Sequence, residues 1–219
     1  MKKGFFLAGL AFTLFACNTN SNNSEAKHDS AGHAAHSEAP SNASNASQSN
    51  PVTGTMDRMM HRMHGAAPTG NNDIDFAAMM IEHHKGAVDM SEVEVSRGKD
   101  PDLKAFAKKV IEDQNKEIGL MEQLMSKAEK TASPNSAAFK QALNGSMTAM
   151  MNSNTKVYND IDKDFAAQMI PHHQSAVDMA KAYLEYGQDK DLRTLCQNII
   201  SSQEKEIEWL RDWLEKNGK

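Results

Sequence analysis

The chain has 219 residues, of which 39% are hydrophobic and 24% charged, and its formal net charge is −5. This is typical of a soluble globular protein with one or two small domains, and the mild acidity argues against nucleic acid as a partner. Two cysteines cannot form a disulfide framework. The unusual residue is methionine, which with 15 copies outnumbers leucine, normally among the commonest residues.

The first residues have the pattern of an export signal. Two lysines precede an apolar run, 5–15, that is too short to span a bilayer, and an alanine and Cys17 follow it. A small residue before a cysteine resembles a bacterial lipobox, in which the signal is removed and the cysteine is lipidated. We expect a signal peptide over 1–16 and a lipid on Cys17, with simple secretion as the alternative. We therefore expect the protein in the cell envelope, anchored by lipid. If the cell has two membranes, we expect the periplasm or the outer membrane, because the asparagine after Cys17 resembles an outer-membrane sorting signal.

Residues 17–54, which begin with the cysteine expected to carry lipid, form a segment of different composition. It is rich in Asn, Ser, Ala and Gly, and such a composition cannot bury enough apolar surface to fold. We therefore expect a disordered tether that keeps the folded part clear of the membrane. Its histidines, His28, His33 and His36, either collect metal ions or are incidental.

The rest of the chain repeats itself with an offset of 89 residues. Residues 75–90 and 164–179 are identical at twelve of sixteen positions, and the register continues without a gap to the end of the first copy. Upstream, a Met-rich stretch at 56–60 has a counterpart at 147–151. Each copy is predicted to hold one short Met-rich helix and two long helices. The predicted repeats are 55–132 and 133–219.

Helix-capping residues mark the expected ends of the long helices. Gly98 and Gly187 are placed as C′ residues, just past helix ends. The expected N-caps are Asp100, Asp189 and either Asn72 or Asp73, and Ser133-Pro134 can open the second repeat. No stretch shows the period-two alternation of a strand. We predict an all-α protein in which two helical hairpins pair into a four-helix bundle, with the short Met-rich helices at its ends.

Polar side chains lie on the predicted inward faces of the long helices. At 100° per residue, His83 and His84 fall among the apolar residues of their helix, and Gln114 and Glu117 fall on the apolar stripe of the next helix. Burying such groups without partners costs several kcal/mol. They therefore belong either to a hydrogen-bonded core network or to a site. The second repeat has the same set: His172, His173, Gln203 and Glu206.

The residue pattern excludes several metal chemistries. A ferritin-like di-iron site needs Glu-x-x-His helices and a zincin needs His-Glu-x-x-His, and the folded part has neither. Zinc fingers need cysteines, and only Cys196, expected in the core, remains there. Imidazole and thioether together are preferred by soft Cu(I) and Ag(I). A second cluster of this kind is formed by His61, His64, Met56, Met59, Met60 and Met63.

Two motifs of the second repeat resemble a known family. Residues 164–180, with the string Met-Ile-Pro-His-His, and residues 203–207 resemble the signature of the domain of unknown function 305 family, and the resemblance covers about 55–216. The family consists of ferritin-like helical bundles and includes the CopM-type copper-binding proteins. The resemblance implies an exported bundle that binds copper or silver and supports copper tolerance. Carried over by position, the implied ligands are Met80, His83, His84, Met90, Met169, His172, His173 and Met179.

The two predicted sites are not equal. Glu82 stands where the family has the proline found at Pro171, and Met121 of the first repeat is replaced by Leu210 in the second. We add Met121 to the candidate ligands. A metal-bound histidine usually gives its other N–H to an acceptor. The residues assigned to this orienting role are Gln114, Glu117, Gln203 and Glu206.

Together these features predict a lipid-anchored envelope protein that buffers or carries copper, as Cu(I) or Cu(II), with silver as its surrogate. No nucleophile–base pair or cofactor loop is recognisable, so we expect no enzyme. The alternatives are a metal-dependent oxidoreductase of the envelope and a structural bundle that docks protein partners. The expected partners are metal ions, the membrane through the lipid on Cys17, and a copper-transfer protein or a second copy of the chain.

Overall fold

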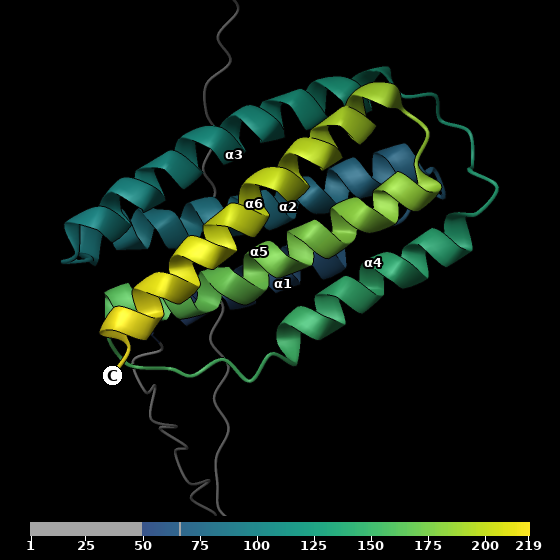
Figure 1. Cartoon of the computed structure of the whole chain (residues 1–219). Coiled ribbons are helices and arrows are strands. Elements are labelled where there is room, and N and C mark those ends of the chain that lie inside the picture. The colour runs from purple at the N-terminus through teal and green to yellow at the C-terminus, as the bar shows by residue number, and fades with distance from the viewer. Residues whose placement is uncertain (1–49, 66) are drawn as a thin grey trace, which may run out of the picture. The chain divides into compact units, whose positions relative to one another are not determined.

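The computed structural model describes residues 50–65 and 67–219, so the expected signal peptide, Cys17 and nearly all of the tether lie outside the described residues. The described part is helical and contains no strand, which confirms the all-α prediction. None of its helices has an apolar stretch long enough to span a membrane. The helices are α1 (Pro51–Gly65), α2 (Asn72–Arg97), α3 (Pro101–Lys127), α4 (Ser136–Met151), α5 (Ile161–Tyr186) and α6 (Lys190–Asn217) (Figure 1).

The four long helices form two hairpins, α2 with α3 and α5 with α6 (Figure 1). The hairpins pack on each other mainly through α2 and α5, whereas α3 and α6 touch far less. Helices α2 and α5 run antiparallel, because Phe76 near the start of α2 stacks on Tyr183 near the end of α5. The short helix α1 packs on both α2 and α5, and α4 packs on α5. Residues of α2 and α5 therefore make the centre of the bundle.

Side chains cap α3 and α6 at the predicted places and α2 one residue earlier, whereas α5 is capped by Asp160, for which no cap was predicted. Asp100 and Asp189 each accept two backbone N–H groups from the first turn that follows them, which satisfies donors that have no partner inside the helix. Helix α2 is capped by Asn71, one residue before the predicted position. The amide of Asn71 also donates to the carbonyl oxygens of Glu129 and Thr131. These contacts with the end of the first hairpin select the cap.

The glycines after α2 and α5 are required by close packing. Gly98 and Gly187 follow these helices as predicted, but their φ angles of −63° and −86° are open to any residue. A Cβ on Gly98 would lie 2.1 Å from Oε1 of Glu94, and one on Gly187 would lie 2.2 Å from the ring of Tyr183. Each glycine thus leaves room for a side chain of the preceding turn.

Helix α1 begins at Pro51, inside the segment whose composition predicts disorder. The N–H of Val52 donates to Oδ1 of Asn50 at 2.9 Å, and Val52 is fully buried in an apolar cluster that includes Leu103 and Phe165. One buried valine and its cap therefore fix the first turn. Helix α1 therefore begins four residues before the predicted start of the first repeat at 55.

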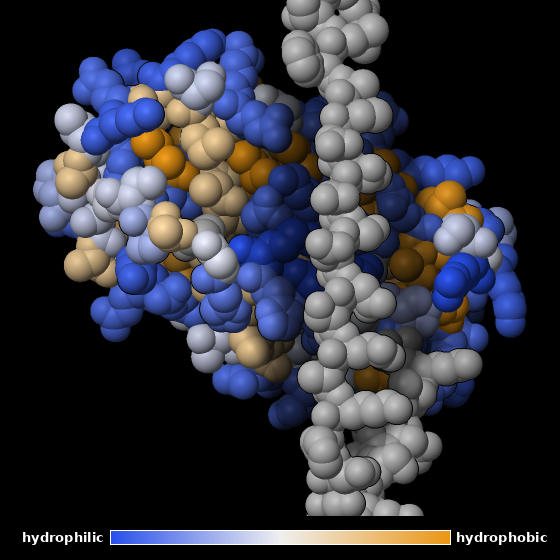
Figure 2. Space-filling model, turned by 180° about the vertical axis from the view of Figure 1, so that it is seen from behind, coloured by the Kyte–Doolittle hydropathy of each residue, from blue (hydrophilic) through white to orange (hydrophobic). Residues whose placement is uncertain are grey.

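Few large apolar side chains of the described residues are exposed. On the face shown in Figure 2, hydrophobic residues appear as separate areas among hydrophilic ones. Cys196, expected in the core, is fully buried, and burial raises the pKa of its thiol. Among the described residues, the exposed large hydrophobic side chains are Leu120, Met151, Val157 and Trp209.

Candidate metal centre

Four histidines from the two hairpins meet where α2 packs on α5. His83 and His84 of α2 and His172 and His173 of α5 are all fully buried; we call them the histidine layer. The ring centroids of His83 and His172 lie 3.8 Å apart. Nε2 of His172 lies 3.1 Å from the carbonyl oxygen of His83. Because a carbonyl only accepts, that nitrogen donates, and Nδ1 of His172 holds the lone pair.

Most ring nitrogens of the histidine layer have no hydrogen-bond partner among the described residues. Both nitrogens of His83 and the Nδ1 atoms of His84, His172 and His173 are buried and unpaired. A buried polar group left unsatisfied costs roughly 1–3 kcal/mol, and native proteins pair nearly all such groups. Several orphaned nitrogens at one place are what a ligand-binding cluster requires.

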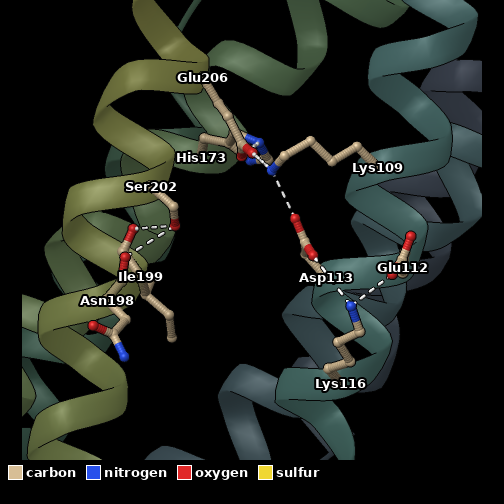
Figure 3. Close-up of polar contacts among 9 residues, drawn as sticks. All are labelled: Lys109, Glu112, Asp113, Lys116, His173, Asn198, Ile199, Ser202 and Glu206. Carbon is tan, nitrogen blue, oxygen red and sulfur yellow. Dashed lines mark hydrogen bonds and ion pairs between the residues drawn. The ribbon is translucent and has the colours of Figure 1, made fainter.

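Two glutamates reach the outer histidines from α3 and α6. Oε2 of Glu117 accepts the Nε2–H of His84 at 2.8 Å. Oε2 of Glu206 lies 3.1 Å from Nε2 of His173, close enough for an ion pair but not aligned as a hydrogen bond (Figure 3). The two carboxylates are 20% and 15% exposed. The helical spacing predicts these contacts, and the hydrogen bond leaves the Nδ1 lone pair of His84 free for another partner.

The inner histidines are neutral. Burial lowers the pKa of His83 and His172 well below the ordinary value of 6.5, and the neighbouring histidines lower it further. For Glu206, burial alone would raise the pKa of the carboxyl, but His173 and Lys109 beside it hold that pKa below its ordinary value. The layer thus combines uncharged imidazoles inside with a carboxylate at its edge, and neutral imidazole is the form that binds metal.

The four residues predicted to orient the histidines line one small pocket. It lies between α3 and α6, has a volume of about 260 Å³ and is bordered by Gln114, Glu117, Gln203 and Glu206. Both glutamines are almost fully buried, and their Oε1 atoms have no partner among the described residues. The structure therefore brings together two pairs of side chains that lie 89 residues apart in the sequence.

One residue beside this pocket is missing from the sequence-based set. Nζ of Lys109 lies 2.6 Å from Asp113 and 3.3 Å from Glu206 (Figure 3). The contact with Asp113, four residues along the same helix, could have been expected from spacing. The contact with Glu206 depends on how the two hairpins dock, and nothing local in the sequence indicates it.

The predicted methionine ligands are all fully buried, but the structure groups them differently from the sequence. Met80, Met121 and Met179 belong to one apolar cluster, and Met90 and Met169 belong to another. Each cluster contains methionines of both repeats, because antiparallel α2 and α5 bring the start of one helix beside the end of the other. Along both helices the histidines lie between the two groups of methionines. The two expected sites therefore adjoin in one central region.

These donors fit a soft cation as cargo. Among residues 50–65 and 67–219, no three His, Cys, Asp or Glu side chains group closely enough to hold a metal ion. An ion in the histidine layer would therefore need further ligands, and the buried methionines that lie on either side of the histidines along α2 and α5 carry thioethers. Neutral nitrogen and thioether sulfur are the donors that Cu(I) and Ag(I) prefer, so the donor set agrees with the predicted metals.

The second cluster of methionines and histidines, predicted at 56–64, does not form one site, because its side chains point in two directions. Met59 and Met63 point into the core. Met56, Met60, His61 and His64 instead line a pocket at the surface.

Comparisons with known proteins agree with the sequence motifs. The profile of the family described as domain of unknown function (DUF305) matches residues 18–125 and 73–214. CopM in a Cu(II)-bound form is 31% identical with a TM-score of 0.52. CopM in a Ag-bound form is 30% identical with a TM-score of 0.51. In both cases the match covers 66% of this chain and 96% of CopM.

A DUF305 protein from Streptomyces coelicolor shares the fold. It is 23% identical with a TM-score of 0.54, and the match covers 69% of this chain and 96% of that protein. Comparison with curated protein sequences finds no significant match. The sequence profile and the similarity to CopM agree in their assignment: the chain belongs to the DUF305 family.

Proposed function

We propose that the histidine layer binds Cu(I), with Ag(I) as a surrogate, and that the protein buffers or carries copper in the cell envelope. The observation that carries this proposal is the cluster of buried, unpaired imidazole nitrogens flanked by buried methionines. CopM, a relative known in Ag-bound and Cu(II)-bound forms, supports it. None of the relatives above carries an enzyme's name, and we propose no catalytic activity.

Within the layer, the histidines have distinct tasks. Nδ1 of His172 and Nδ1 of His84 hold lone pairs, because their Nε2 atoms donate to the His83 carbonyl and to Glu117. These two nitrogens are the first candidates to bind an ion. The carboxylates of Glu117 and Glu206 keep the outer rings in place, a role that raises the basicity of a ligand. The buried methionines supply sulfur.

The proposal is tested by competition of the full chain against a Cu(I) chelator of known affinity. Replacing His83, His84, His172 and His173 by Gln should remove the tightest-bound ion. The matched control replaces the tether histidines His28, His33 and His36 by Gln and should leave that ion in place. Full metal loading of a four-histidine variant with a lowered melting temperature would show that the histidines are only structural.

The same titration separates soft from borderline ions. Because thioethers select soft cations, the parent protein should bind Cu(I) and Ag(I) more tightly than Zn(II). If the four-histidine variant does not fold, imidazole ¹⁵N shifts of the parent on adding Ag(I) provide the second measurement. Zn(II) binding as tight as Cu(I) binding would contradict the proposal.

The envelope location rests on the lipid proposed for Cys17. Cys17→Ser should move the protein from the membrane fraction to the soluble fraction of cells. Cys196→Ser is the matched control, since Cys196 is buried in the core and should leave fractionation unchanged. A Cys17→Ser protein that stays with membranes would contradict the anchor. We also propose a copper-transfer protein or a second copy of the chain as a partner.

A further inference from the structure

A second group of soft ligands lies at the surface, between α1 and α4. Both helices pack on α5, and a pocket of about 690 Å³ lies between them. One face of α1 contributes Met56, Met60 and His64, and the last turn of α4 contributes Met150 and Met151. The pocket shares no residue with the histidine layer.

The pocket brings together the two copies of a Met-Met pair. The sequence repeat places this pair at 59–60 in α1 and at 150–151 in α4. The first methionine of each pair is buried. The second lines the pocket: Met60 is half-buried, and Met151 is 62% exposed. Two sequence-distant thioethers are thus available to one solvent-accessible space.

The imidazole of His64 is oriented for ligation. Its Nδ1 lies 2.8 Å from the carbonyl oxygen of Met60. A carbonyl only accepts, so Nδ1 carries the proton and Nε2 keeps its lone pair. A backbone acceptor on one ring nitrogen is the usual support for a metal ligand on the other. The described lining of the pocket includes the carboxylate of Asp57 and neither Lys nor Arg, so its charge does not repel a cation.

We propose that this pocket is a second site for Cu(I) or Ag(I), with Met60, His64 and Met151 as ligands. Two thioethers and one neutral imidazole form a donor set that selects soft cations. Because the pocket is open to solvent, its ion exchanges without any opening of the bundle. The histidine layer, by contrast, is fully buried, so its ion should exchange more slowly.

The test uses the full chain, methionine labelled with ¹³C in the methyl group, and Ag(I), which stays in one oxidation state. In the parent, the methyl signals of Met60 and Met151 should shift on titration. The variant Met60→Leu/His64→Gln/Met151→Leu should bind about one ion fewer, and Met–Leu exchange keeps the volume close to native. Met125→Leu, a half-buried methionine that does not line this pocket, is the matched control and should keep the full count.

Two results separate this site from the histidine layer. The four-histidine variant should lose the buried ion yet still show the shifts of Met60 and Met151. If the triple variant binds as many Ag(I) ions as the parent and the two methyl signals of the parent do not move, the surface site is overturned. That result leaves the histidine layer untouched, since the two sites share no ligand.

Discussion

The two ends of the α2–α5 contact have corresponding residues, but one end has a tyrosine hydroxyl where the other has a glutamate carboxyl. At one end, the hydroxyl of Tyr183 donates to Asp73 at 2.5 Å. At the other end, Glu94 occupies the position that corresponds to Tyr183 in the sequence repeat, and Asp162 corresponds to Asp73. Glu94 is fully buried, and Asp162 is an acceptor like itself. Neither carboxyl oxygen of Glu94 has a hydrogen-bond partner among the described residues, so no donor stabilises its charge, and the charge of Asp162 disfavours that charge further.

The surroundings of the two acidic residues match. Asp162 accepts the backbone N–H groups of Lys99 and Asp100 at 2.8 and 2.9 Å, and Asp73 accepts that of Gln188 at 3.3 Å. Burial, with the charge of Asp162, raises the pKa of Glu94 to about 8. The two repeats thus keep the same arrangement around the acidic residue. One end carries a phenol that stays protonated, and the other carries a carboxyl that titrates near neutral pH.

The largest expected effect is on the pH dependence of stability. The pKa of Glu94 is about 8 in the fold against 4.5 ordinarily, so between these values the folded state binds more protons. The free energy of unfolding should therefore fall as pH rises from 4.5 to 8, by at most about 1.4 kcal/mol per unit. Denaturant unfolding of the metal-free protein between pH 6.5 and 9 measures this slope. Glu94→Gln, which cannot titrate, should abolish it, and an unchanged slope would contradict the raised pKa of Glu94.

The histidine layer acts with the opposite sign. The pKa values of His83 and His172 lie below 6.5 in the fold, so below pH 6.5 the unfolded state binds more protons and stability falls as pH falls. The parent should be most stable near pH 6.5. Glu94→Gln should instead keep a plateau between pH 6.5 and 8.

The next effect concerns the two glycines that give room to Tyr183 and Glu94. Gly187→Ala should destabilise by about 1–3 kcal/mol through overpacking, because the Tyr183 ring is fixed by Phe76 and Asp73. Gly98→Ala should also destabilise, because its Cβ would lie 2.6 Å from the backbone carbonyl oxygen of Glu94, which cannot turn aside as the carboxyl can. Thermal unfolding measures both. Gly119→Ala is the control, because no atom lies within 4 Å of its Cβ position and alanine favours a helix there.

A third comparison uses the two glutamates beside the histidine layer. Among the described residues Glu117 accepts a hydrogen bond from His84, whereas Glu206 is shared between His173 and Lys109. Glu117→Gln should lower Ag(I) affinity by about 10-fold, and Glu206→Gln should lower it less. A competition titration measures both affinities. Equal falls in Ag(I) affinity for the two variants would show that Lys109 does not weaken the interaction of Glu206 with His173.

The smallest effect is expected at the tyrosine end. Tyr183→Phe removes one hydrogen bond and should cost about 1 kcal/mol. Because burial and Asp73 raise the pKa of Tyr183, the phenol stays protonated and this cost should be constant between pH 5 and 8. Urea unfolding at several pH values checks it, and a cost that varies with pH in this range would contradict a phenol that stays protonated.

Local signals predicted the helices well. Asp100 and Asp189 cap where their sequence positions indicate, because a cap depends on a few neighbouring residues. The contact of His84 with Glu117 also followed from spacing, since both face inward on consecutive helices. These features depend only on residues within one hairpin, so the sequence of that hairpin is enough to predict them.

Contacts between the hairpins were beyond such signals. The sequence repeat predicts two sites, but it does not show that antiparallel α2 and α5 place His83 on His172. The shift of the α2 cap to Asn71 has the same origin, since distant carbonyl groups select it. The alignment of the two repeats does pair Glu94 with Tyr183. The raised pKa of Glu94, however, depends on its burial, which the sequence does not show.

The contact of His83 with His172 has a kinetic consequence. These residues come from separate hairpins and lie 89 positions apart in the chain. An ion held by both would act as a cross-link, so the hairpins could not separate until it left. Its effect would then resemble the closing of a long loop and would slow unfolding, making the residence time of the metal a determinant of the lifetime of the fold.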